Sequence, residues 1–388
     1  MDRFLVILVN GYLSQAELKI ILSKAMIKFK IIENNEIFVI LEVEKASELL
    51  KLGGIYKVGE IICVNNSLER IFDEIEQDGT LTNLEDKQQW NVSYYSDEMM
   101  DIDVFDEIQN NFAGLIKESS KKTKFIRNNM KSDNFIELSV DKEKEDAVNI
   151  LVGNSNKKYY IAENKISIKS IDFIDRDLNR PYQDSRISLS PRTARILVNI
   201  LGLEDGSTIL DPFCGTGTFL MESIIQGYKV IGVDNRKECV FGTKKNLLWI
   251  MKEQNLRNRM KYVKQDDAEK LSCVETSTID GIVTEPILLP HFKNSPNYEI
   301  AEDVLKKSKK IYEKSLRAMF RVLKNNGKVS IVTPRIKTRD NNYITFSFRK
   351  MVKESGFILD NRLDEQPFVM KASGDQKVLR EIWLLKKN

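Results

Sequence analysis

The sequence has very few residues of the kinds that bind metal ions or form disulfides. Its 388 residues include one histidine, His291, and four cysteines that form no CxxC pair, Cys63, Cys214, Cys239 and Cys273. Structural zinc sites need about four such ligands, usually in closely spaced pairs, so the composition argues against a metal site. Scattered cysteines are typical of reduced thiols, and we therefore expect a cytoplasmic protein that binds no metal.

Long apolar runs are also missing. No stretch approaches the roughly 18 apolar residues that a membrane span requires. The opening residues, MDRFLVILVN, are interrupted too early for a signal peptide and are typical of a strand. We therefore expect no membrane association. An apolar content of 42% is enough for ordinary hydrophobic cores, and the length favours two or three domains.

The net charge is small, +3, but it is unevenly distributed. The segment 69–107 contains 13 acidic and 2 basic residues, which leaves a charge of +14 on the rest of the chain. We interpret the acidic segment as a solvated loop or a mobile insertion. The basic excess elsewhere permits a polyanionic partner without requiring one.

The first half of the chain predicts two α+β regions. Residues 1–66 alternate β-branched runs, such as EIFVILEV, with helical stretches, which predicts a ferredoxin-like region. Residues 67–171 contain the acidic segment, an expected helix over 104–122 and strand-like runs such as AVNILVG. A basic cluster follows that helix and comprises Lys121, Lys122, Lys124 and Arg127. The cluster fits phosphate binding, and it fits a solvated basic turn equally well.

The second half has a regular alternation of strands and helices. A polar segment, residues 172–186, is expected to be a linker, and residues 187–388 follow as one domain. Repeated β-α-β units, closed by an expected antiparallel pair, predict an α/β fold with a mainly parallel, doubly wound sheet. The first helix is expected to begin with Ser190 as its N-cap and Pro191 in its first turn.

A glycine loop follows the first strand of this domain. It reads ILDPFCGTGTF, residues 209–219, and Gly215 and Gly217 allow a sharp turn and a close approach of backbone to ligand. The third glycine of a dinucleotide-binding GxGxxG motif is missing, because Leu220 follows Phe219. No Walker lysine follows either, which argues against a P-loop.

Acidic residues end the next two strands, and ligands of such sheets bind at the carboxyl ends of the strands. Asp234 ends the second strand, where a carboxylate can accept hydrogen bonds from both hydroxyls of a ribose. Asp267 and Ala268 follow the third strand, where they can face an adenine ring. An acid at a strand end is often only a turn or a cap, but these residues in order on successive strands favour an adenosine-type cofactor.

The segment DRDLNRPYQDSRISLSPRTARILVNILGLEDGSTILDPFCGTGTFLMES resembles the archaeal and eukaryotic tRNA guanosine-N2 methyltransferases that act at position ten of tRNA. The resemblance covers residues 172–290 and extends more loosely to the C-terminus. It implies a class I (Rossmann-like) methyltransferase domain with a mainly parallel seven-stranded sheet, preceded by an α+β THUMP-like RNA-binding region. It also implies S-adenosylmethionine as cofactor, tRNA as partner, and an activating protein subunit of the kind that eukaryotic members need.

Pattern and resemblance together predict the cofactor site. The family's helix start borders the methionine end of the cofactor, and its strand ends surround the rest. The predicted cofactor-binding residues are Ser190, Pro191, Asp211, Cys214, Gly215, Gly217, Thr218, Asp234, Asn235, Asp267 and Ala268.

The catalytic motif after the fourth strand is Asp/Asn-Pro-Pro-Tyr/Phe in this family, and this chain reads Glu-Pro-Ile-Leu over 285–288. By resemblance, the Glu285 carboxylate and the Pro286 carbonyl accept hydrogen bonds from the target amino group, so that catalysis rests on alignment and charge placement. Leu288 lacks the ring on which a base can stack. His291, Phe292 and Tyr298 are candidates for that role, and they are also candidates for ordinary loop residues.

Three functions remain open from the sequence. The first is methylation of an exocyclic amino group of a guanosine in tRNA. The second is a non-catalytic RNA-binding paralogue that retains the methyltransferase fold, which the substitutions Ile287 and Leu288 would explain. The third is amino methylation of DNA adenine or of a protein, for which the THUMP-like first half would be out of place.

Overall fold

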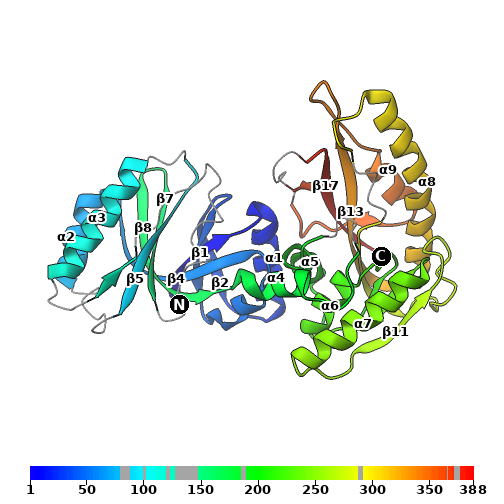
Figure 1. Cartoon of the computed structure of the whole chain (residues 1–388), viewed down its shortest axis with the longest axis horizontal. Helices are drawn as coiled ribbons and strands as arrows, with labels where there is room; N and C mark the ends of the chain where they lie inside the picture. Colours follow the sequence, from blue (N-terminus) through cyan, green and yellow to red (C-terminus); the bar gives the residue numbers. More distant parts are fainter. Residues whose placement is uncertain are drawn as a thin grey trace. The chain divides into compact units, whose positions relative to one another are not determined.

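A computed structural model describes residues 1–78, 88–98, 102–118, 123–126, 147–184, 189–286, 292–364, 366–370 and 376–388. The chain divides into two compact units (Figure 1). Unit 1 comprises Met1–Leu18, Ala25–Leu50 and Gly54–Ser170. Unit 2 comprises Lys19–Lys24, Lys51–Gly53 and Ile171–Asn388.

Unit 1 is built on a mixed sheet with the strand order β2-β3-β1-β4-β8-β7-β5-β6. The strands are β1 (Asp2–Leu8), β2 (Phe29–Asn34), β3 (Phe38–Val43), β4 (Ile55–Asn65), β5 (Gln89–Ser96), β6 (Lys124–Phe125), β7 (Val148–Ser155) and β8 (Lys158–Ser167). In the described part of the chain, β5 pairs in parallel with β6 and β7, and the other neighbours are antiparallel. The region is therefore α+β.

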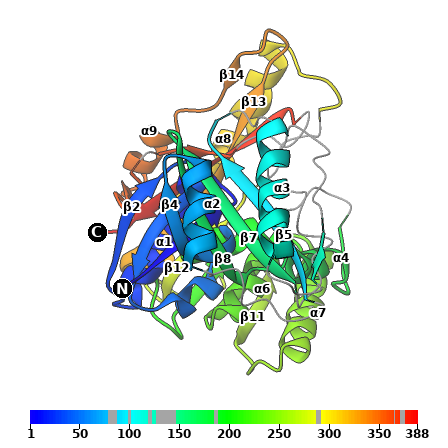
Figure 2. The ribbon, with the colours of Figure 1, turned by 90° about the vertical axis from the view of Figure 1, so that its left-hand side faces the viewer.

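The acidic segment of unit 1 is largely folded, so the expectation of a solvated loop is wrong for the residues described. It forms α2 (Leu68–Asp78), β5 and the start of α3 (Ile102–Glu118). Ile71 and Ile75, one helical turn apart, are buried with Phe112 and Trp90. The acidic residues Glu69, Asp73, Glu74 and Glu76 of α2 are exposed. Figure 2 shows α2 and α3 across one face of the sheet. The remaining helices of this half are α1 (Gly11–Lys24) and the 3₁₀-helix Ala46–Lys51.

Unit 2 contains the predicted α/β fold. Its strands are β9 (Thr208–Asp211), β10 (Lys229–Asp234), β11 (Met260–Gln265), β12 (Ile279–Thr284), β13 (Leu323–Lys337), β14 (Tyr343–Ile344), β15 (Ile358–Leu359), β16 (Phe368–Val369) and β17 (Val378–Lys386). Along the order β11-β10-β9-β12-β13-β17-β15, the first five strands are parallel and β17 is antiparallel to both neighbours. The predicted count of seven is not exact, because β14 and β16 add to these seven and make nine described strands.

Helices cover both faces of this sheet because its central strands are apolar on both faces (Figure 1). On β10, Val230 packs in the core under α6 (Thr218–Ile225) and α7 (Lys237–Glu253). Ile231 and Val233 pack in the core under α8 (Tyr298–Val322) and α9 (Phe348–Glu354). Helix α5 (Pro191–Asn199) begins as predicted, since Ser190 Oγ accepts a hydrogen bond from Thr193 N at 3.2 Å. Helix α4 (Ser170–Leu178) occupies the start of the segment predicted as a linker.

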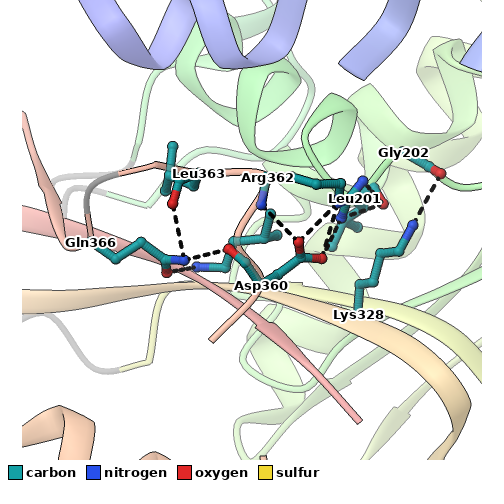
Figure 3. A network of polar contacts seen from close by, with 8 residues as sticks. Leu201, Gly202, Lys328, Asp360, Arg362, Leu363 and Gln366 are labelled. Carbon is teal, nitrogen blue, oxygen red and sulfur yellow. Dashed lines mark hydrogen bonds and ion pairs between the residues drawn. The ribbon is translucent and has the colours of Figure 1, made fainter. Parts of the chain in front are cut away.

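A polar network secures the antiparallel end of the sheet (Figure 3). Arg362 forks onto Asp360, with Nη2 to Oδ2 at 2.8 Å and Nε to Oδ1 at 3.0 Å, and also donates to the carbonyl of Leu201 after α5. Gln366 donates to Asp360 O at 2.6 Å and accepts from Leu384 N in β17 at 2.8 Å. Burial opposes ionisation of Asp360, but its bonds with Arg362 keep its pKa below the usual value. The network therefore fixes β17, which carries a residue of the candidate site.

Candidate active site at the strand ends of unit 2

Unit 2 has a cavity of about 460 Å³ where β9, β10 and β12 end. It brings together nine of the predicted site residues: Asp211, Cys214, Gly215, Thr218, Asp234, Asn235, Asp267, Ala268 and Glu285. Parallel strands end at one edge of a sheet, which is why acids separated by more than 70 residues line one cavity.

The two glycines form the turn from β9 into α6, and each needs its lack of a side chain. Gly215 has φ +51° and Gly217 has φ +87°, both in the left-handed region. A Cβ on Gly217 would lie 2.9 Å from Cγ2 of Thr243, so this position is closed to larger residues. A Cβ on Gly215 would meet open space, with no atom nearer than 4.0 Å, so this backbone is open to a ligand in the cavity.

Helix α7 holds the glycine turn from behind through residues that the sequence did not single out. Thr243 Oγ1 donates to Gly215 O at 2.8 Å. Asn246 Nδ2 donates to Thr216 O at 2.8 Å and to Tyr182 O at 2.9 Å. All three acceptors are backbone carbonyls, so these bonds set the shape of the turn.

Asp234 is fixed by two backbone amides, one on each of its carboxylate oxygens. Its Oδ2 accepts from Gly215 N at 2.9 Å, and its Oδ1 accepts from Arg236 N at 3.0 Å. Its Oδ1 also faces Nε of Arg236 at 3.5 Å, so the carboxylate is held in one position at the cavity. Asp267 is likewise ordered, since its Oδ1 accepts from Glu269 N at 2.9 Å.

Asp211 is the most deeply buried acid of the site. Burial raises its pKa to about 7; the nearby Asp234 and Glu285 add to the rise, and bonds from Thr284 and Phe213 oppose it. Thr284 Oγ1 donates to Asp211 Oδ1 at 2.8 Å, and Phe213 N donates to the same atom at 3.1 Å. The site therefore contains a carboxyl that titrates near neutral pH.

Glu285 follows β12 and forms a buried ion pair with Arg380 of β17. Arg380 Nε donates to Glu285 Oε1 at 2.6 Å, and both side chains are at most 14% exposed. Burial raises the pKa of Glu285, and Arg380 acts against this rise. The pair spans 95 residues of sequence, and no local motif indicates Arg380.

The carbonyl of Pro286 is next to a buried phenol. Tyr312 Oη of α8 lies 3.4 Å from Pro286 O and 3.1 Å from Val332 O, and its single hydrogen is shared between these acceptors. Burial, with a contribution from the charge of Glu285, raises the pKa of Tyr312 well above its usual value. The hydroxyl therefore stays protonated and serves as a donor.

Four predicted site residues do not line the cavity: Ser190, Pro191, Gly217 and Pro286. Lys124 lies on β6 of unit 1, whereas Lys121, Lys122, Arg127, Ile287, Leu288 and His291 lie outside the described residues. Of the two described candidates for an aromatic platform, Phe292 packs against the core of unit 2, and Tyr298 is 56% exposed at the start of α8.

Within the same described ranges, the chain has neither a metal-binding cluster nor a membrane-spanning helix. No group of three or more metal-ligating side chains is arranged there to hold an ion. None of the described helices combines the length and apolar character that crossing a bilayer requires.

A mainly parallel sheet with helices on both faces, a glycine turn after its first strand and acids at the following strand ends define the methyltransferase class of α/β domains. Residues 179–360 match the UPF0020 family model, described as an RMKL-like methyltransferase domain.

Two archaeal proteins named tRNA (guanine(10)-N2)-dimethyltransferase are similar to the chain. The protein from Methanothermobacter thermautotrophicus is 34% identical over 38% of this chain and 39% of its own length. The protein from Methanocaldococcus jannaschii is 28% identical over 66% of this chain and 73% of its own length. The chain is thus a relative of the tRNA guanosine-N2 methyltransferases, which confirms the family predicted from the sequence.

The crystal structure of TrmN from Thermus thermophilus has a similar fold. It superposes with a TM-score of 0.61 over the full length of both chains, at 16% identity. The α/β methyltransferase fold predicted from the sequence is thereby confirmed.

Proposed function

We propose that this chain is an S-adenosylmethionine-dependent tRNA (guanine-N2) methyltransferase. The observation that carries the proposal is the position of Glu285. Its carboxylate lines the same cavity as the glycine turn and is held at the end of β12 by Arg380. An acceptor at this place can bind an exocyclic amino group beside a methyl donor, and the archaeal relatives are named for that reaction on guanine.

The charges that line the cavity fit the positive groups of the cofactor. Six carboxylates line it, from Asp184, Asp211, Asp234, Asp267, Glu269 and Glu285, and Arg236 is the one cation among the described lining residues. A sulfonium and an ammonium group are stabilised by such a negative field. The bare backbone at Gly215 leaves room for a ligand against the turn.

When bound, S-adenosylmethionine supplies an electrophilic methyl group. The protein then has to align the target amino group with that methyl group and to stabilise the charge that develops on the nitrogen. The carboxylate of Glu285, paired with Arg380, accepts a hydrogen bond from the target amino group and stabilises the positive charge that develops on its nitrogen. The Pro286 carbonyl is a second acceptor, and Tyr312 fixes its direction. Asp211, with a pKa of about 7, can hold a proton near the same wall.

Unit 1 is the region for which we propose RNA binding. The THUMP-like assignment, the basic cluster at Lys121, Lys122, Lys124 and Arg127, and the boundaries at residues 66, 171 and 186 remain predictions from the sequence. Substrate tRNA, a cytoplasmic location and an activating subunit belong to the same proposal.

Methyl transfer to tRNA tests the function. The full chain is incubated with labelled S-adenosylmethionine and an unmodified tRNA pool, and the digested product is analysed for N2-methylguanosine. We expect label in that nucleoside and none in a parallel reaction with duplex DNA. Cofactor binding without methylated guanosine across the whole pool would favour the non-catalytic paralogue, and label in DNA adenine would favour the third function.

A further inference from the structure

A short ribbon of unit 2 extends beyond the strand end that carries Glu285. Strand β12 ends at Thr284, which lies opposite Ile331 of β13. Strand β13 continues to Lys337, about 20 Å farther at the usual rise per residue, and returns as β14. We call residues 334–344 the β13–β14 hairpin. On the other side of β13, Pro334 lies opposite Arg380 of β17, the partner of Glu285. The hairpin therefore begins beside the Glu285–Arg380 pair.

One face of this hairpin combines cations with an aromatic ring. Ile336 is buried, and its neighbours Arg335 and Lys337 therefore face the opposite way. Tyr343 lies across from Lys337 in the strand register and is 40% exposed. The Arg335 guanidinium carbon lies 5.0 Å from the centre of the Tyr343 ring. The guanidinium and the ring thus form a cation–π pair on this face.

The turn of the hairpin is tied to the start of α8. Arg339 N donates to Pro296 O at 3.0 Å, and Arg339 Nε donates to Ser295 O at 3.3 Å. The exposed ring of Tyr298 follows directly on α8. These bonds hold the turn and a second aromatic residue together, so the surface is ordered.

Two acids lie close to this surface, and both contact residues of unit 2. Asp340 accepts hydrogen bonds from Thr338 and Asn342, and these bonds lower its pKa. Glu381 lies 3.6 Å from Arg335 but is itself buried. Asp340 therefore keeps its negative charge, and the three cations Arg335, Lys337 and Arg339 outnumber it on the hairpin.

We propose that the β13–β14 hairpin, with Arg335, Lys337, Arg339 and Tyr343, binds an unpaired nucleotide of the RNA next to the target base. The inference rests on the proposed function. A base whose amino group reaches Glu285 must leave its stack, which exposes the flanking nucleotide at the mouth of the cavity. Aromatic rings stack on such bases, and arginine and lysine bind the adjoining phosphates. The exposed tyrosine also supplies a stacking surface that the Glu-Pro-Ile-Leu motif lacks.

Binding of a tRNA transcript to the full chain, measured by fluorescence anisotropy with S-adenosylhomocysteine present, tests the surface. Reversing two charges with K337E/R339E is expected to weaken binding roughly 10- to 100-fold. The slope of log affinity against log salt concentration should also become shallower, by the amount expected for the loss of about two phosphate contacts. Tyr343→Ala is expected to weaken binding roughly tenfold, while Tyr343→Phe retains it. The matched control, K244E/K245E on the exposed face of α7, carries the same charge change and is expected to stay within about threefold.

Kinetics separate this surface from the proposed function. In methyl transfer, the hairpin variants should raise KM for tRNA, while kcat at saturating tRNA stays within about threefold. Two results would overturn the proposed RNA-binding role of the hairpin. One is an equal loss of tRNA affinity in the hairpin variants and the α7 control, and the other is wild-type protein that binds no tRNA. Selective loss of binding in protein that methylates no guanosine would uphold the surface and reject the proposed reaction.

Discussion

The two walls of the cavity in unit 2 are built in different ways. The wall under the predicted cofactor consists of short turns that follow β9, β10 and β11, and Asp234 is held by backbone amides of Gly215 and Arg236. The wall that faces the predicted acceptor depends on side chains distant in sequence, since Glu285 is held by Arg380 of β17. Local turns can be recognised in one stretch of sequence, whereas the acceptor wall exists only once the antiparallel end of the sheet has folded.

The walls also differ in how they hold negative charge. The cofactor wall collects carboxylates that a cationic ligand would neutralise, and Asp211 titrates near pH 7 as a result of its burial. The acceptor wall neutralises its acid internally through a guanidinium. Changes in the first wall should therefore appear in cofactor affinity, and changes in the second should appear in kcat.

The largest effect is expected from Glu285→Gln. The amide keeps the size of the side chain but loses the charge that stabilises the developing cation, so kcat should fall about 100-fold. Cofactor affinity, measured by calorimetry, should stay within about threefold. Glu269→Gln is the matched control, because Glu269 lines the same cavity but pairs with Lys314. An equal loss of kcat in both variants would contradict a distinct acceptor wall.

Removal of Arg380 should have the next largest effect. Burial raises the pKa of Glu285, and Arg380 opposes that rise, so Arg380→Met should raise the pKa further. The neighbouring Asp211 and the phenol of Tyr312 supply no positive charge in its place. Because the ionised form is active, kcat at neutral pH should drop about 30-fold and recover as the pH is raised.

The pH profile distinguishes this role from a purely structural one. The acid limb of kcat should move to higher pH in Arg380→Met and less far in Arg380→Lys, which keeps a cation. A uniform loss at every pH, with an unmoved acid limb, would mean that Arg380 serves only the packing of β17.

The sequence predicted strand ends well and long-range partners poorly. Asp211 was placed in the site because parallel strands end at one edge of a sheet, a rule that needs no tertiary detail. Arg380 was missed because its place depends on the register of β17, which sets it opposite Pro334. The prediction of a solvated loop for the acidic segment is wrong because it rests on charge and ignores the helical spacing of apolar residues. Ile71 and Ile75, four residues apart, are buried on one face of α2.

A smaller effect is expected from Asp234→Ala on cofactor affinity. The substitution removes both acceptors that order the turn, at Gly215 N and Arg236 N, together with one of the negative charges of the cavity. Calorimetry with S-adenosylmethionine should show affinity reduced about tenfold, roughly 1.4 kcal/mol, which is close to the lower end of what losing a charged hydrogen bond costs. Asp303→Ala on the exposed surface of α8 is the control. Unchanged affinity in Asp234→Ala would mean that the cofactor does not lie against this wall.

The smallest effect is the pH dependence that Asp211 should give to cofactor binding. With a pKa of about 7, Asp211 becomes negative as the pH rises through neutrality, and a cationic ligand should bind roughly fivefold more tightly at pH 8 than at pH 6. Binding should also release a proton, which calorimetry detects as a dependence on the buffer's ionisation enthalpy. Asp211→Asn should abolish both signatures.

Stability of the unliganded protein supplies an independent check on Asp211. Its pKa is raised above that of an unfolded aspartate, so the stability it contributes is present at low pH and is lost as the pH rises through about 7. Thermal unfolding should therefore show wild type losing stability relative to Asp211→Asn from about pH 4, the pKa of an unfolded aspartate, up to about pH 7, and cofactor should restore part of the loss. If the stabilities of the two proteins change in parallel over that range, Asp211 is ionised throughout. The cofactor wall then does not titrate near neutral pH, and the contrast with the acceptor wall, which Arg380 neutralises, does not hold.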